Sequence, residues 1–273
     1  QNKLLRNDKL LHSYPHSWRS KAPLVYRATP QWFISMEKKS LRDTAIKAIH
    51  ETTFYPPKGK DRLLSMVEGR PDWCVSRQRV WGVPLPIFIN KKTKEPLRDQ
   101  KVIDRIAEIY EKEGSDCWFT DDMEKFLGKE HDPINFEKLT DIVEVWFDSG
   151  STHSFVLEKR KDLKWPADMY LEGSDQHRGW FHSSLLESCG TRGKAPFKSI
   201  LSHGFVVDGK GLKMSKSTGN VISPEDILKN YGADILRAWV ASSDYAEDLR
   251  IDKTILAQHA ESYRKIRNTF RFV

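Results

Sequence analysis

The second half of this 273-residue sequence alternates short apolar runs with helix-like segments, and this alternation limits the possible folds more than any other feature. Residues 142–147 and 168–171 are largely apolar, and each run is followed by polar residues and glycine. Leu185 and Cys189 then lie one helical turn apart before Gly190, which predicts a helix that Gly190 caps. Strands that alternate with helices are typical of an α/β sheet, so we predict that both runs are strands of one.

Polar residues and glycine follow the second predicted strand. Glu172, Gly173, Asp175 and Gln176 stand between this strand and the helix. Ligands of open α/β sheets bind at the carboxyl ends of strands, beside helix N-termini. Glycine lets a ligand approach the backbone, and carboxylates and amides suit ribose hydroxyls or an amino group. These residues are therefore a candidate ligand site. The alternative is that Ser174 or Asp175 only caps the helix, and residue chemistry leaves both open, since capping and binding are compatible.

A glycine-flanked loop with two lysines is the second candidate site. Lys213 and Lys216 belong to the string KMSKS (residues 213–217), which follows a predicted strand at residues 205–207. Flexible ammonium groups and free backbone N–H groups suit the binding of polyphosphate. From residue chemistry alone, the alternative is a solvated basic loop.

Signals for a helix start follow the lysine loop. Ser223, Pro224 and Asp226 fit the N-cap, N1 and N3 positions of a helix, and Gly232 fits its end. From residue 253 onward the sequence is basic and has a helical pattern. We therefore predict helices at residues 224–231 and from residue 253 onward.

The first half of the sequence predicts short strands and one helix, followed by an inserted module. Residues 1–35 alternate polar and apolar positions, as short strands do, whereas residues 37–51 show a helical pattern. Residues 73–76 predict a strand, after which Arg77 and its neighbours either bind phosphate or anchor a wall of the fold; residue chemistry favours the wall. Residues 91–140 are more polar and predict an inserted module.

Charge and cysteine content indicate a polyanion partner and a reducing compartment. Lys and Arg number 45 against 38 acidic residues, a net charge of +7. Cys74, Cys117 and Cys189 are scattered and odd in number, which indicates no disulfide framework and favours a cytoplasmic location. The apolar runs are too short to span a membrane, so no membrane partner is expected.

Four separated strings resemble the isoleucyl-tRNA synthetase family of class I aminoacyl-tRNA synthetases. They are WCVSRQR (73–79), VWFDSGS (145–151), YLEGSDQHRGWF (170–181) and the lysine string (213–217). The lysine string is shared across class I, whereas the second and third strings are those that distinguish the isoleucyl family. The likeness covers nearly the whole chain.

This resemblance implies a fold and a division into domains. The implied fold class is α/β, the second half of a Rossmann-type parallel sheet with insertions, followed by the start of an α-helical domain. Residues 1–90 would be a catalytic-core segment after an editing insertion, and 91–140 an inserted connective module. Residues 141–252 would be the second Rossmann half with the lysine loop, and 253–273 the start of an anticodon-binding domain.

The resemblance also implies a two-step reaction: ATP activates isoleucine, and tRNA(Ile) then accepts the isoleucyl group. Lys216, and secondarily Lys213, would be catalytic by neutralising the departing polyphosphate. Lys216 would bind ATP together with Gly173, Asp175 and Gln176, and Mg²⁺ would accompany the triphosphate. The implied partners are isoleucine and tRNA(Ile), and the implied protein is a monomer.

Three further residues receive roles from the resemblance. Glu172 would hold the aminoacyl-adenylate, and Trp146 and Trp180 would form the walls of the amino-acid pocket. Without the resemblance, both tryptophans would be assigned to the hydrophobic core.

No metal site is expected near the N-terminus. Many relatives have cysteines where this chain has Ser17 and Ser20, and serine supplies no thiolate for zinc. His12 and His16 alone do not complete a tetrahedral site.

The other class I signature, His-x-Gly-His, does not occur in the sequence. We therefore expect a partial catalytic core that is inactive alone. Two alternatives remain: a non-catalytic RNA-binding remnant of the same fold, and a nucleotide-binding protein of another class, such as a nucleotidyltransferase.

Overall fold

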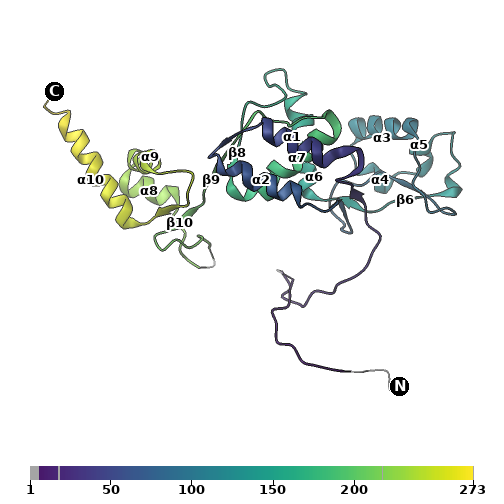
Figure 1. Cartoon of the computed structure of the whole chain (residues 1–273), viewed down its shortest axis with the longest axis horizontal. Coiled ribbons are helices and arrows are strands. Elements are labelled where there is room, and N and C mark those ends of the chain that lie inside the picture. Colours follow the sequence, from purple (N-terminus) through teal and green to yellow (C-terminus); the bar gives the residue numbers. More distant parts are fainter. Residues whose placement is uncertain (1–5, 18, 217, 273) are drawn as a thin grey trace.

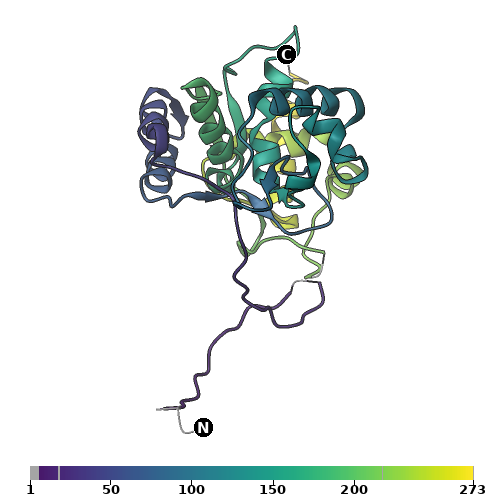
Figure 2. The same ribbon diagram turned by 90° about the vertical axis from the view of Figure 1, so that its right-hand side faces the viewer.

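The computed structural model describes residues 6–17, 19–216 and 218–272. Figure 1 shows the elements in three groups along the longest axis, with the C-terminal helices at one end and the inserted module at the other. Each group has its own cluster of buried hydrophobic residues. Residues 6–17 and 19–28 run away from the body as an extended segment in both views (Figures 1 and 2), whereas Gln31 and Trp32 are hydrogen-bonded to Ser76.

The central group contains a three-stranded parallel sheet with the order β2-β9-β8. Its strands are β2 (Thr53–Tyr55), β8 (Tyr170–Gly173) and β9 (Ser199–His203). Helices α1 (Leu41–Glu51), α2 (Lys58–Glu68) and α7 (Trp180–Arg192) accompany it. Apolar residues of all three helices join the strands in one core, so the prediction of an α/β fold with a parallel sheet is confirmed.

Two short antiparallel pairs lie beside this core. In one, β1 (Phe33–Ile34) pairs with β3 (Trp73–Cys74), and in the other β4 (Ser76–Arg77) pairs with β7 (Ile142–Val143). Directly after β7 the chain forms α6 (Val145–Gly150), followed by a π-helical turn, η3 (His153–Leu157). The two pairs thus place residues 73–77 next to β1 and next to β7, the strand that leads into α6.

The inserted module packs around Trp118, whose indole N–H donates to the Leu139 carbonyl at 2.8 Å. Its buried aromatic rings meet edge to face. Its elements are β5 (Phe88–Asn90), α3 (Gln100–Glu113), α4 (Cys117–Thr120), α5 (Met123–Leu127), η2 (Pro133–Asn135) and β6 (Phe136–Lys138).

The C-terminal group begins with the parallel pair of β10 (Val206–Asp208) and β11 (Leu249–Ile251). Its helices are α8 (Pro224–Tyr231), α9 (Ala233–Ser242) and α10 (Lys253–Thr269). The Ser223 hydroxyl accepts from the Asp226 N–H at 3.2 Å, which confirms the predicted helix start. Leu256 of α10 is buried in the same cluster as Ile227 and Trp239.

Three predicted elements are wrong. Residues 142–147 form a strand only at β7, because Glu144 turns the chain into α6. Gly190 lies inside α7, which ends at Gly193 with a left-handed φ of 73°. In the described residues 6–17 and 19–35 the only strand is β1, since residues 6–17 and 19–28 extend away from the core that would pair them. The domain boundaries remain predictions.

None of the helices in the described ranges 6–17, 19–216 and 218–272 is long and apolar enough to cross a membrane.

Candidate functional site

The first part of the candidate site is the carboxyl end of β8. Glu172 and Gly173 are the last two residues of the strand, and Gly173 lies opposite His203 of β9 in the parallel ladder. The turn η4 (Ser174–Arg178) follows at once. A Cβ atom on Gly173 would lie 2.7 Å from a carboxylate oxygen of Asp175, so a larger residue here would displace the Asp175 side chain.

Gly179 brings three of the predicted site residues together. A Cβ atom here would lie 2.8 Å from the Trp146 ring and 2.4 Å from the Gln176 amide oxygen. That oxygen accepts the backbone N–H of Trp180 at 2.9 Å. The bare backbone of Gly179 thus allows Trp146 of α6 to pack directly against the start of α7.

The two tryptophans differ in how freely they face a ligand. One face of Trp180 stacks on Tyr170, with ring centroids 4.0 Å apart and planes 2° from parallel, and its indole N–H donates to the Ser149 carbonyl at 3.0 Å. Trp146 is 39% exposed. Trp180 is therefore held rigidly by the core, and Trp146 offers the open surface.

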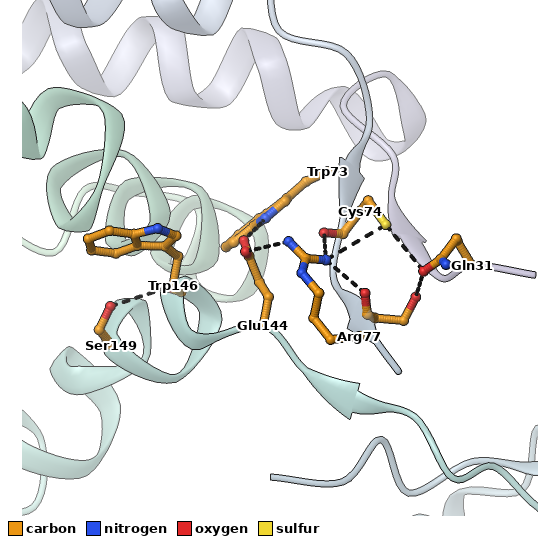
Figure 3. Close-up of polar contacts among 8 residues, drawn as sticks. Gln31, Trp73, Cys74, Arg77, Glu144, Trp146 and Ser149 are labelled. Atoms are coloured by element: carbon orange, nitrogen blue, oxygen red, sulfur yellow. Dashed lines mark hydrogen bonds and ion pairs between the residues drawn. The ribbon is translucent and has the colours of Figure 1, made fainter. Parts of the chain in front are cut away.

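Glu144 fixes the start of the helix that carries Trp146 (Figure 3). One carboxylate oxygen accepts the indole N–H of Trp73, and the other accepts Arg77 at 2.7 Å. The guanidinium of Arg77 also donates to the carbonyls of Cys74 and Ser76, at 3.0 and 2.7 Å. Arg77 is thus a structural anchor, in agreement with the interpretation favoured from the sequence.

Carboxyl groups gather on the inner side of α6. Burial raises the pKa of Asp148, and the nearby charge of Glu144 raises it further. Burial, together with the charges of Asp148 and Glu144, raises the pKa of Glu187 to about 9. Glu187 therefore lies protonated against α6 at neutral pH, where Gly150 leaves it room.

The lysine loop is held in shape by Asp208 and Asn220. The Asn220 amide donates to the Asp208 carboxylate at 2.9 Å and to the Lys213 carbonyl at 3.2 Å, and its oxygen accepts the Ser215 N–H at 2.9 Å. Asp208 also accepts the N–H groups of the turn at Lys210 and Leu212, at 3.0 and 2.8 Å. Hydrogen bonds from Asn220 and this turn keep the pKa of Asp208 below its usual range.

Lys213 and Lys216 are exposed in this loop, while Ser217, the last residue of the string, lies outside the described residues. No hydrogen bond or ion pair among residues 6–17, 19–216 and 218–272 joins either lysine side chain to the end of β8. The loop belongs to the C-terminal group, and Trp146 and Trp180 belong to the central one. The structure thus brings Trp146, Gln176 and Trp180 together at the start of α7. Within the described part of the chain, it does not join these residues to the lysine loop.

A family model described as "tRNA synthetases class I (I, L, M and V)" matches residues 10–252, most of the chain. The chain belongs to this family. All four strings quoted above begin and end inside the matched range.

Individual relatives extend this result. The chain is 75% identical over all 273 residues to the isoleucine–tRNA ligase of Pelagibacter ubique (strain HTCC1062), of which it covers 30%. It is 56% identical over 277 residues to the isoleucine–tRNA ligase of Caulobacter vibrioides, covering 99% of this chain and 28% of that ligase. The chain thus spans about 30% of the length of these relatives.

A solved structure shows the same fold. A methionyl-tRNA synthetase of Mycobacterium tuberculosis in complex with methionyl-adenylate superimposes with a TM-score of 0.58, at 17% identity. The match covers 92% of this chain and 41% of the synthetase. The chain therefore shares the fold of that part of the synthetase.

Sequence reasoning missed the network around Glu144. Its members come from β3, β4 and the start of α6, so only the tertiary fold reveals it. The one available signal was the string WCVSRQR itself, which contains Trp73 and Arg77 but not their shared carboxylate.

Proposed function

We propose that this chain is part of the catalytic core of an isoleucine–tRNA ligase. The proposal rests on one observation, the 75% identity to such a ligase across all 273 residues. The geometry supports it, because Trp146, Trp180 and Gln176 meet at the carboxyl edge of a parallel sheet, where α/β folds bind ligands.

The first step of the proposed reaction is activation. The carboxylate of isoleucine attacks the α-phosphorus of ATP, which forms isoleucyl-adenylate and releases pyrophosphate. Positioning and charge neutralisation are the main contributions that a protein makes to such a step. Lys216, assisted by Lys213, neutralises the leaving pyrophosphate, because both side chains are exposed on a loop that Asn220 holds in shape.

Binding of the adenylate falls to the end of β8. Glu172 holds the adenylate, and Gly173, Asp175 and Gln176 contact the ATP moiety. Trp146 offers its exposed ring to the aliphatic side chain, and Trp180 closes the pocket from a fixed position.

The second step is transfer. A ribose hydroxyl at the end of tRNA(Ile) attacks the activated carbonyl and releases AMP. Mg²⁺ enters with the triphosphate; the described residues contain no group of three His, Cys, Asp or Glu side chains that could hold an ion, so no protein ligand is assigned to it. We further propose a cytoplasmic, monomeric enzyme.

ATP–pyrophosphate exchange by a full-length ligase that carries these 273 residues tests the proposal. Exchange should depend on isoleucine, and in a separate aminoacylation assay with tRNA the ligase should form isoleucyl-tRNA(Ile). Exchange driven instead by leucine or methionine would disprove the assigned amino acid. Binding of tRNA without exchange for any amino acid would favour the RNA-binding alternative.

A further inference from the structure

A cleft between the end of α2 and the start of α7 has no role in the function proposed above. Its volume is about 480 Å³, and it is lined by Ser65, Gly69 and Arg70 on one side and by Arg178 and His182 on the other. Small-molecule sites commonly measure roughly 300–1,000 Å³. The cleft is therefore large enough for a nucleotide-sized group.

Two guanidinium groups converge on this cleft without an acidic partner. In the part of the chain that the structure describes, no ion pair includes Arg70 or Arg178, and none of the residues lining the cleft is acidic. The Arg70 Nε is buried without a hydrogen-bond partner, while its guanidinium lies 5.4 Å from the Trp73 ring centroid. Burial lowers the pKa of Arg70, and the nearby charge of Glu144 raises it but does not cancel this effect, so a bound anion would stabilise the charge of Arg70 further.

His182 adds a buried and unpartnered polar group. Its side chain is 4% exposed, and neither ring nitrogen has a hydrogen-bond partner. Burial lowers the pKa of His182 to about 3, and the charges of Arg70 and Arg178 lower it further. The neutral ring therefore keeps one N–H group that is free to donate to a ligand.

The cleft adjoins the candidate amino-acid pocket. A smaller hollow of about 50 Å³ shares Arg70, Arg178 and His182 with it and is also lined by Trp146 and by Glu144, whose carboxylate is already bound to Trp73 and Arg77. A ligand in the cleft would thus lie next to the Trp146 wall.

We propose that Arg70, Arg178 and His182 form a phosphate-binding site, and that its occupant is a phosphodiester near the acceptor end of the tRNA. Forked guanidinium donors match phosphate oxygens, and the histidine N–H supplies a further donor. This inference rests on the proposed function, in which the tRNA end must reach an isoleucyl group beside Trp146. The ATP phosphates are assigned to the lysine loop, so the tRNA is the phosphate source that this site fits.

The test replaces Arg178, because it is exposed and its loss leaves the core intact. In the full-length ligase, Arg178→Ala should raise the KM for tRNA about ten- to a hundred-fold, the size of one lost charged hydrogen bond. The slope of log binding constant against log salt should become less steep by about 0.7, as for one lost contact to a single strand. Isoleucine-dependent pyrophosphate exchange without tRNA should not change.

Arg98→Ala is the matched control, since Arg98 is also an exposed arginine but lies outside the cleft. An effect on tRNA no larger than that of the control would overturn the site. A raised KM for ATP in exchange would overturn the tRNA assignment and give the phosphate to ATP. If the unmodified ligase shows no exchange, the proposed function fails, but direct tRNA binding by the same variants still decides whether the cleft binds phosphate.

Discussion

Lys216 is the residue whose proposed role is tied most directly to the chemical step. Its ammonium group is exposed and should matter most when pyrophosphate leaves. We expect Lys216→Ala to lower the kcat of pyrophosphate exchange by a factor of about 10²–10³, the usual cost of losing one donor at a developing charge. Affinity for isoleucine should change little. An unchanged kcat with a raised KM for isoleucine would contradict the role.

Glu187 makes stability depend on pH. Its pKa is about 9 in the folded protein against an ordinary value of 4.5, so the folded state keeps a proton that the unfolded state loses above about pH 4.5. The stability of the fold should therefore fall as the pH rises from 4.5 to 9. The amide of the Glu187→Gln variant cannot ionise, so the stability of this variant should not fall with pH for this reason.

The expected result is equal thermal midpoints for the two proteins near pH 4 and a higher midpoint for Glu187→Gln at pH 9. One unit of pKa shift corresponds to about 1.4 kcal/mol, or roughly 3–6 °C in a domain of this size, and the difference should be at least that. Glu108→Gln is the control, because Glu108 is exposed on α3. A difference that does not grow with pH would show that Glu187 ionises normally.

At the scale of elements, the lysine loop depends on a single amide. Asn220 joins Asp208 at the end of β10 to the backbone at Lys213 and Ser215. Asn220→Asp keeps the size of the side chain but replaces two N–H donors by an oxygen that faces the Asp208 carboxylate. The loop should loosen, and the pKa of Asp208 should rise because its hydrogen bond from Asn220 is lost.

We expect Asn220→Asp to lower the kcat of exchange about ten- to a hundred-fold, since a loosened loop misplaces the lysines. Asn230→Asp on α8 is the matched control, as the Asn230 amide donates to the Asp226 carbonyl of its own helix and lies outside the lysine loop. Exchange kinetics of the two variants decide the point. Equal rates would mean that the loop takes its shape from the bound nucleotide instead.

Elements with strong local signals were predictable from the sequence. The Ser223 cap and the Gly232 end of α8 are local features, and β8 is an apolar run of ordinary strand length. In contrast, α6 is a six-residue helix whose Val145, Trp146 and Phe147 look like a strand, because so short a run has no clear period. The prediction placed Trp146 in a strand, whereas the structure places it in helix α6, where it packs at the start of α7 next to Trp180.

The candidate site was predictable only where its residues are neighbours in the sequence. Glu172, Gly173, Asp175 and Gln176 follow one strand, so their place at its carboxyl end could be inferred. The Glu144 network and the Arg70–Arg178–His182 cleft join segments that are far apart in the chain, so neither leaves a local pattern. Gly179 is intermediate, since its need for glycine appears only when Trp146 packs on it.

At the scale of the whole molecule, the resemblance to class I synthetases implies a two-sided phosphate clamp, in which the histidines of the His-x-Gly-His string hold the triphosphate opposite the lysine loop. The lysine loop is present, but the sequence has no His-x-Gly-His string to face it, and the chain covers about 30% of its ligase relatives. A triphosphate held from one side only lacks the fixed near-attack geometry that activation requires. The 273 residues alone should therefore give no isoleucine-dependent pyrophosphate exchange.

Recovery is expected when the remaining parts of the ligase are supplied in cis or in trans, because they would complete the clamp. Cooperative thermal unfolding of the 273 residues is the control that separates an incomplete site from an unfolded chain. Phosphate or tRNA binding by the folded chain without exchange would agree with an intact Arg178 cleft beside an incomplete catalytic centre. Strong exchange by the 273 residues alone would contradict the two-sided clamp, since the lysine loop and the Glu172 segment would then suffice for activation.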